Sequence, residues 1–357
     1  MRISHFSLVL GLGLILSVSA GDFDAAAQAP KINKPRPAPP TPPNVPPLPP
    51  AYFDPTLAVG GEDIEARRAS TRLNVEVLVN GRGPYRFLVD SGADTSVVGL
   101  RIARDLQLPL GTPAILNGMT ARHLVDRVKV AQLTLGPTTV RDLQLPALRE
   151  SDLGGEGMIG IDALTQQRLM MDFESRLIKV EDASTPLKIL PGDIVVTARR
   201  QRGQLILTAV KAAGVSLDAV IDTGTEISIG NSALRDKLLH KRAKFETIAT
   251  TGVTGVTVDL QVAFVRELQL GPITLQNVPI AFADVPPFAL FGLADEPALL
   301  LGTDILSTFR RISLDFRARK VRFQLRRCKP DSLVMSTSSR AAMTRLFSRG
   351  DTDSCRR

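Results

Sequence analysis

Two copies of an Asp, hydroxyl, Gly triplet are the residues of this 357-residue sequence that are best suited to chemistry. The first, Asp90–Gly92, follows the apolar run Phe87–Val89, and the second, Asp222–Gly224, follows Ala219–Ile221. One such triplet is a common turn, because Asp, Ser and Gly favour turns. Two copies with matching apolar flanks are much harder to assign to chance, so the pair is taken as a single site.

Two aspartates within hydrogen-bond distance cannot ionise independently, and the pair shares one proton. The ionised carboxylate can take a proton from water while the protonated one donates to a substrate carbonyl, which is general acid–base catalysis. Asp90 and Asp222 are therefore the candidate catalytic pair. Each Gly allows close backbone approach, and each hydroxyl can tie the two loops together. The expected supporting residues are Ser91, Gly92, Thr223, Gly224 and Thr225.

Other elements repeat in the same order after each triplet. A Leu-x-Leu-Gly-Pro segment at 133–137 recurs at 268–272, and an apolar-apolar-Gly-x-Asp segment at 158–162 recurs at 300–304. An apolar-Asp-Phe segment closes each half. Strand patterns dominate both halves, and long amphipathic helices are scarce. Duplication of one lobe is the natural account, with the two lobes facing each other across a pseudo-two-fold axis.

These motifs resemble the aspartic protease superfamily, whose main branches are pepsin-like and retropepsin-like. Residues 90–94 resemble the retroviral version of the motif and residues 222–225 the pepsin version. The resemblance covers nearly all of residues 70–181 and 203–324. It implies an all-β, bilobal acid-protease fold with two closed, barrel-like lobes and short helices. It also implies an aspartic endopeptidase that acts on extended polypeptides and needs no cofactor.

The resemblance further implies a substrate-covering hairpin, or flap, some 25 to 30 residues after each triplet. In the first half Asn117-Gly118 is typical of a tight hairpin turn. A glycine-rich segment fits the same place in the second half. The alternative is two ordinary surface hairpins. The candidate flap residues are Asn117, Gly118, Met119, Gly252, Val253 and Thr254.

Two further pairs of aspartates are repeated between the halves, Asp162 with Asp304 and Asp172 with Asp315. Symmetry alone would allow either pair to be the catalytic one. Only Asp90 and Asp222 stand at a strand end before a hydroxyl and Gly, so we expect the others to cap helices and close turns.

The chain is expected to have five parts. Residues 1–29 resemble a cleaved signal peptide, and residues 30–56 form a stiff, proline-rich linker, for which a removable propeptide is the alternative. The N-terminal lobe would span residues 57–181 and the C-terminal lobe residues 182–327. Residues 328–357 would be a basic, disordered tail. An exported protein, periplasmic or secreted, is the consequence.

The net charge of +8 is concentrated at the C-terminal end, where residues 317–357 hold twelve Lys and Arg against three Asp. Such a tail suits peripheral contact with an anionic cell envelope, whereas nucleic acid is not an expected partner of an exported chain. Three His and two Cys offer no convincing metal site, although Cys328 and Cys355 could form a disulfide.

Two alternatives remain open. The active species could be a homodimer, although a monomer is favoured because the segment between the lobes allows them to pair within one chain. The fold could also serve as a catalytically silent peptide-binding or scaffolding protein. If the protein is an enzyme, we expect a mild pH optimum, because Ala93 lacks the hydroxyl that Thr225 could offer to a carboxylate.

Overall fold

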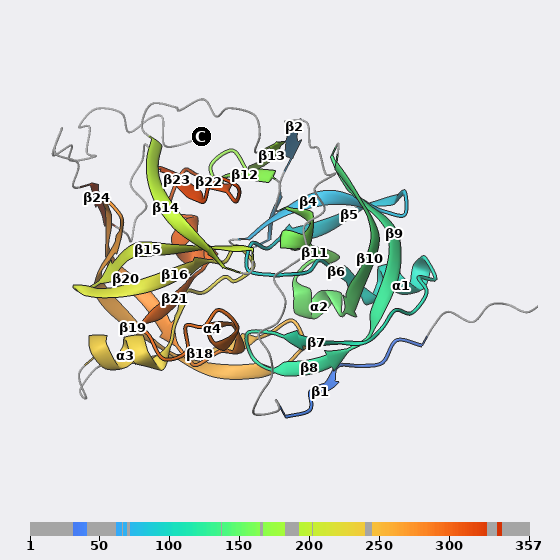
Figure 1. Cartoon of the computed structure of the whole chain (residues 1–357), viewed down its shortest axis with the longest axis horizontal. Coiled ribbons are helices and arrows are strands. Elements are labelled where there is room, and N and C mark those ends of the chain that lie inside the picture. The colour runs from blue at the N-terminus through green and yellow to red at the C-terminus, as the bar shows by residue number, and fades with distance from the viewer. Residues whose placement is uncertain are drawn as a thin grey trace, which may run out of the picture.

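The computed structural model describes residues 31–40, 62–65, 67–69, 72–136, 138–164, 167–182, 193–201, 203–239, 245–326 and 334–337 (Figure 1). For 62–65, 67–69, 138, 167, 182 and 334–337 only the backbone is described. The expected signal peptide, most of the basic tail and both cysteines lie outside these residues. The ends of the two lobes at 57 and 327 also lie outside them, so those bounds stay predictions.

Each half of the chain forms a closed, six-stranded barrel. The first barrel closes where β4 pairs with β9, and the second closes where β15 pairs with β19. In order around the first barrel, its strands are β4 (Arg72–Val79), β5 (Arg82–Val89), β11 (Gly157–Ile159), β6 (Val97–Gly99), β10 (Thr138–Leu148) and β9 (Arg127–Leu135). Those of the second are β15 (Gln204–Ala212), β16 (Val215–Ile221), β21 (Ala298–Leu301), β17 (Ile229–Gly230), β20 (Ile273–Phe282) and β19 (Thr257–Leu270).

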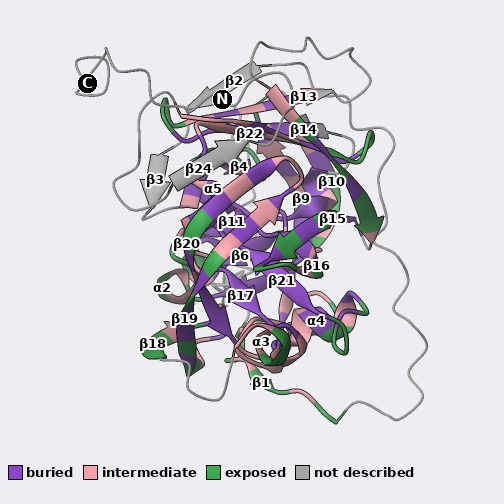
Figure 2. Ribbon diagram, turned by 90° about the vertical axis from the view of Figure 1, so that its left-hand side faces the viewer, coloured by how far each residue is buried: buried purple, intermediate pink, exposed green. Residues whose placement is uncertain are grey.

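Along the barrel strands, inward-facing apolar side chains alternate with outward-facing ones. In β4, Val75, Val77 and Val79 point into the barrel and are at most 1% exposed, whereas Glu76 is exposed. The short strands that cross each barrel behave differently, because they have neighbours on both sides: all four residues of β21 are buried. Such continuous apolar runs are typical of parallel pairings, and β21 lies parallel to β16, as β11 lies parallel to β5. The burial is concentrated within the barrels (Figure 2).

A third sheet joins the lobes along the edge shown at the top of Figure 1. Its strands are, in order, β14 (Asp193–Gln201), β23 (Lys320–Gln324), β22 (Arg311–Asp315), β12 (Gln167–Asp172), β13 (Leu177–Asp182) and β2 (Glu62–Glu65). β14 belongs to two sheets, because it pairs with β23 in this sheet and with β15 of the second barrel.

The remaining elements are short. The helices are α1 (Leu100–Asp105), α2 (Glu150–Leu153), the 3-10 turn η1 (Ile161–Ala163), α3 (Ser232–Leu238), α4 (Pro286–Leu290) and α5 (Thr303–Leu306). The other strands are β1 (Arg36–Pro37), β3 (Arg67–Ala69), β7 (Ala114–Asn117), β8 (Arg122–Val125), β18 (Glu246–Thr251) and β24 (Val334–Thr337). Among the described residues, no helix is long and apolar enough to cross a membrane. The predicted all-β, bilobal fold with short helices is confirmed.

Residues 30–56 are expected to form a stiff, proline-rich linker, and residues 31–40 of it are described. There β1 forms an antiparallel ladder with β8, so part of this segment pairs with the first lobe. The composition excludes a buried core but leaves alternate backbone amides free to pair with a neighbouring strand.

The interlobe sheet carries two ion pairs related by the pseudo-two-fold symmetry. In the β12–β22 ladder, Arg168 lies opposite Asp315 and Asp172 lies opposite Arg311. The Nε of Arg168 is 3.1 Å from the Oδ2 of Asp315, and the Nη2 of Arg311 is 2.7 Å from the Oδ2 of Asp172. Burial acts to raise the pKa of Asp172, but the backbone N–H of Ser175 and the Arg311 guanidinium outweigh it and leave the pKa below its ordinary value.

These pairs predict unequal losses of stability. Arg168→Ala leaves the carboxylate of Asp315 buried without its cation, which typically costs about 3–5 kcal/mol in the free energy of unfolding. Arg311→Ala should cost less, because the Arg311 side chain is 24% exposed against 4% for Arg168. Urea unfolding of both variants checks the order. The double variant Arg168→Met with Asp315→Leu should recover most of the loss, and equal losses for the two arginines would contradict the interpretation.

Candidate active site

The two triplets meet between the lobes. Asp90 follows β5 and Asp222 follows β16, so each carboxyl stands at the end of a barrel strand and faces the other. Both residues are buried, with 8% of each exposed, and their carboxyls share a hydrogen bond. The structure therefore brings together the two aspartates that the sequence singles out.

Four hydrogen bonds lock the two loops to each other through Ser91 and Thr223. The backbone N–H of Ser91 donates to the Thr223 hydroxyl (2.9 Å), and the N–H of Thr223 donates to the Ser91 hydroxyl (3.2 Å). The Ser91 hydroxyl in turn donates to the carbonyl of Ile221 (2.9 Å), and that of Thr223 to the carbonyl of Val89 (2.8 Å). Each hydroxyl therefore both accepts and donates across the lobe boundary, and this four-bond lattice fixes the distance between the loops.

Gly92 and Gly224 each lie against the carboxyl of the opposite lobe. A Cβ on Gly92 would stand 2.6 Å from the Cγ of Asp222, and a Cβ on Gly224 would stand 2.1 Å from the Cγ of Asp90. Any side chain at either position would push the carboxyls apart. Close approach, rather than an unusual backbone conformation, is the reason for glycine here.

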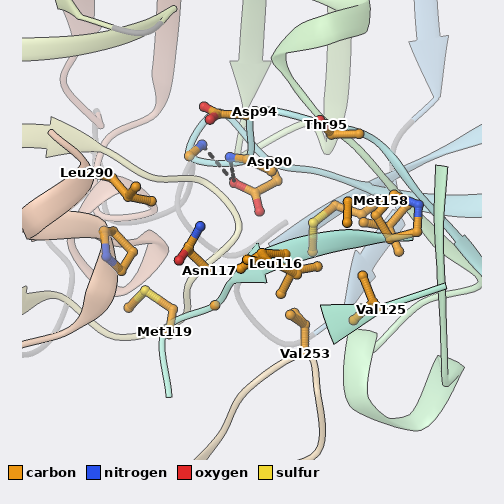
Figure 3. Close-up of a pocket in the computed structure, with 18 of the residues that line it drawn as sticks. Asp90, Asp94, Thr95, Leu116, Asn117, Met119, Val125, Met158, Val253 and Leu290 are labelled. Carbon is orange, nitrogen blue, oxygen red and sulfur yellow. Dashed lines mark hydrogen bonds between the residues drawn. The ribbon is translucent and has the colours of Figure 1, made fainter. Parts of the chain in front are cut away.

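Each carboxylate also accepts hydrogen bonds from its own loop. The Oδ1 of Asp90 accepts from the backbone N–H of Gly92 (2.7 Å) and of Ala93 (3.1 Å), shown as dashed lines in Figure 3. The Oδ1 of Asp222 accepts from Gly224 (3.0 Å) and Thr225 (3.1 Å) in the same way. One oxygen of each carboxyl is thereby held by the backbone.

The electrostatics of the two carboxyls differ. Burial raises the pKa of Asp222 to about 8, and the charge of Asp90 adds to the rise. Burial also raises the pKa of Asp90, but the backbone N–H groups of Gly92 and Ala93 and the charge of Arg72 act against it. Burial therefore raises the pKa of both carboxyls, and the charge of Arg72 favours the ionised form at Asp90.

Thr225 does not have the role expected for its hydroxyl. That hydroxyl donates to the carbonyl of Ile227 (3.1 Å), and the contact with Asp222 is made by the Thr225 backbone N–H instead. The reason given for a mild pH optimum, the absence of a matching hydroxyl at Ala93, is therefore wrong. Burial of the pair provides a different reason for the same expectation.

Two residues that sequence reasoning missed hold the loops from outside. Arg72, which begins β4, donates to the carbonyl of Gly224 (3.3 Å) and forms an ion pair with Glu226 (3.3 Å). Gln204, which begins β15, donates to the carbonyl of Gly92 (3.4 Å) and to the carboxylate of Asp94. The two residues stand at the same separation in sequence as the two triplets, so the internal repeat could have revealed them. One is a cation and the other is neutral, which makes the site electrostatically asymmetric.

Ser96 and Ser228 are a second missed pair, and they explain Asp162 and Asp304. The carboxylate of Asp162 accepts from the hydroxyl (2.7 Å) and backbone N–H of Ser96, and that of Asp304 accepts from the same groups of Ser228. These aspartates lie behind the two triplet loops and close them, as the turn-closure interpretation proposes.

Both expected flaps are hairpins. β7 and β8 form the first, and β18 with the start of β19 forms the second. The first turn differs from the prediction: Asn117 still pairs with Arg122, and the N–H of Gly118 donates to the carbonyl of Ala121 (3.0 Å). The turn is therefore centred on Met119 and Thr120 rather than on Asn117-Gly118. The Asn117 side chain accepts from the Nε of Arg122 across the hairpin (2.9 Å).

The two hairpins meet above the carboxyls. A Cβ on Gly252 would stand 2.2 Å from the hydroxyl oxygen of Thr120, and one on Gly118 would stand 3.7 Å from the side chain of Val253. Under the hairpins lies a cleft of about 280 Å³ lined by both aspartates. That volume is at the low end for small-molecule sites, so the hairpins leave little room over the carboxyls.

The predicted flap residues do not all face this cleft. Asn117, Gly118, Met119 and Val253 line it, and Figure 3 shows Asn117, Met119 and Val253 below Asp90. Thr254 instead lines a separate cavity beside α1 and α2. Among the described residues there is no group of three or more His, Cys, Asp or Glu that could hold a metal ion.

The hydroxyl lattice predicts a specific sensitivity at residue 223. Thr223→Val keeps the shape but removes one hydroxyl that both donates and accepts across the lobe boundary, whereas Thr223→Ser keeps it. Leaving the buried carbonyl of Val89 and N–H of Ser91 unpaired should cost about 1–3 kcal/mol for each group. Thermal or urea unfolding measures this. Comparable stability of the Val and Ser variants would show that the lattice does not hold the lobes.

Comparison with protein families and curated proteins gives one match. The family model described as Aspartyl protease matches residues 75–163 and 208–305, which together make up more than half of the chain. The first segment contains the Asp90 triplet and the second the Asp222 triplet. No curated protein gives a match. With one family segment on each barrel and one triplet in each segment, the chain belongs to the aspartyl protease family.

Proposed function

We propose that this protein is an aspartic-type endopeptidase that hydrolyses peptide bonds of extended polypeptides with a water activated between Asp90 and Asp222. The single observation that carries the proposal is the buried pair of carboxyls, hydrogen-bonded to each other under two hairpins. The family membership supports it.

In the proposed reaction the two aspartates divide the work. The ionised Asp90 takes a proton from the water, whose oxygen attacks the carbonyl carbon of the scissile bond. The protonated Asp222 donates to the carbonyl oxygen, which gives a neutral tetrahedral intermediate. The proton held by Asp90 then passes to the departing nitrogen, and Asp222 recovers its proton as the new carboxylic acid forms.

The asymmetry around the loops supports this division. The guanidinium of Arg72 donates to the carbonyl of Gly224, the residue that lies against the carboxyl of Asp90. A cation there favours the ionised form of Asp90. At the symmetry-related position stands the neutral Gln204, which gives no such preference.

The two hairpins that cover the cleft suit a polypeptide substrate. An extended chain lying between the hairpins can form backbone hydrogen bonds with their tips, which is a common mode of peptide recognition. We also propose that one chain suffices, because a single polypeptide contributes both aspartates, both hydroxyls and both hairpins. Export from the cytoplasm and contact of the basic tail with the cell envelope stay predictions from sequence.

Removing either carboxyl should abolish turnover. In Asp90→Asn or Asp222→Asn the amide can still accept the backbone hydrogen bonds, but the shared proton is lost, and general acid–base catalysis contributes about 10²–10⁴-fold to the rate. Cleavage of a diverse peptide library by the two variants checks this. Asp218→Asn, which changes a carboxylate on β16 that pairs with Arg199, is the matched control and should cleave normally. Cleavage by the Asp90 and Asp222 variants at the normal rate would contradict the mechanism.

The pKa values predict activity from mildly acidic to neutral pH. Activity should appear as Asp90 ionises, above the ordinary aspartate pKa of 3.8, and disappear as Asp222 loses its proton near pH 8. The pH dependence of kcat/KM measures both limbs. A maximum at about pH 2–3, closer to the pepsin range, would contradict it.

Arg72→Gln removes the cation that favours ionised Asp90, so the acidic limb of its kcat/KM profile should move to higher pH. An unmoved limb would show that Arg72 has no electrostatic role.

A further inference from the structure

Residues 31–40 run along the outer edge of the first flap, below β8 in Figure 1. Arg36 lies opposite Leu124 and Pro37 opposite His123, and the N–H of Ala38 donates to the carbonyl of Arg122 (3.2 Å). With β7 on its other side, β8 is the central strand of a three-stranded sheet. The flap is therefore more than a simple hairpin.

The spacing of the prolines suits this pairing. In an antiparallel ladder, alternate residues direct their N–H and C=O groups to the same neighbouring strand. Pro35, Pro37 and Pro39 alternate with Arg36 and Ala38, so the residues without an N–H face away from β8. The segment can pair on one edge only, and its outer edge has fewer donors to offer a further strand.

Asp126, at the base of the flap, anchors the segment. The residue is 7% exposed, and its Oδ2 accepts from both the backbone N–H and the side-chain Nδ2 of Asn33, each at 2.8 Å. Its Oδ1 lies 3.5 Å from the guanidinium of Arg36. A buried carboxylate needs such partners, and within the described part of the chain this segment supplies them for the Asp126 side chain. Ile32 packs against the main hydrophobic core beside this anchor.

The segment acts on one flap only. In the second flap, the outer edge of β18 has no neighbouring strand among the described residues. The tips of the two flaps meet at Gly252 and Thr120, so the first flap has to lift for the cleft to open. A strand bound along β8 opposes that movement, because lifting the flap breaks the pairing of β1 with β8 or strains the hydrogen bonds between Asn33 and Asp126.

We propose that the outer edge of β8 and the carboxylate of Asp126 form a second peptide-binding site, distinct from the catalytic cleft. Its ligand is an extended segment that places an amide side chain and a cation around alternating prolines. Residues 31–40 of this chain occupy the site and strap the first flap over the cleft. The binding is independent of the proposed function, and only the effect on turnover rests on it.

Hydrogen–deuterium exchange of the full chain tests the site without requiring activity. Asn33→Ala with Ala38→Pro removes the anchor amide and the N–H that donates to Arg122, while proline remains compatible with an extended segment. Exchange in residues 114–125 should become about tenfold faster, as expected for the loss of two hydrogen bonds, while the second flap, residues 246–257, keeps its rate. Pro37→Ala, which changes only the outward edge, is the matched control and should leave both flaps unchanged.

The outcomes separate the site from the enzyme. Unchanged exchange of the first flap in the double variant, or equal acceleration of both flaps, overturns the proposal that residues 31–40 hold the first flap over the cleft. Asp126→Ala, which removes both carboxylate oxygens that face Asn33 and Arg36, should accelerate the first flap in the same way, and failure to do so overturns the anchor. If the unaltered protein cleaves peptides, the double variant should show a severalfold higher kcat/KM, and an unchanged kcat/KM with faster exchange overturns the control of turnover. If no form cleaves any peptide, the proposed function fails while the exchange result still decides the strap.

Discussion

The structure depends on holding two buried carboxyls against each other. Burial and mutual repulsion both oppose this arrangement, and separation of the lobes would relieve it. The hydroxyls of Ser91 and Thr223 prevent the separation, because each is bonded to the backbone of the other lobe in both directions. The glycines that follow make the approach sterically possible. The remaining structure keeps these two loops in register.

Three sets of contacts related by the pseudo-two-fold symmetry keep the two loops in register. Asp162 and Asp304 close the loops from behind, Arg72 and Gln204 hold them from the sides, and the crossed Arg–Asp pairs of β12 and β22 join the lobes at the sheet furthest from the flaps. Symmetry alone would leave the two carboxyls equivalent. The exchange of a cation for a neutral amide between Arg72 and Gln204 breaks that equivalence, so a duplicated scaffold can give its two halves different chemical roles.

The sequence predicts the parts of this structure that depend on short residue patterns repeated in both halves. The triplets, the turn-closing aspartates and the strands before them all follow from patterns within a few residues, and duplication makes each pattern visible twice. The partners of those residues were harder to predict. Arg72 and Gln204 reach loops of the opposite lobe, and nothing near them in sequence indicates it, although their matching positions in the repeat do. The first flap turn was misplaced because Asn-Gly favours a tight turn in isolation, whereas the pairing of Asn117 with Arg122 moves the turn to Met119 and Thr120.

The proline-rich segment shows most clearly which structural features composition predicts and which it does not. Prolines exclude a buried core and remove N–H donors, and from these facts a solvated spacer is the simplest interpretation. Their alternation carries different information, because it leaves one edge of an extended strand able to pair and weakens the other. Whether such an edge is used depends on a partner elsewhere in the chain, here β8 and the buried carboxylate of Asp126. A segment that cannot fold by itself can therefore still affect how readily a folded hairpin moves, and in this protein that hairpin covers the two buried carboxyls.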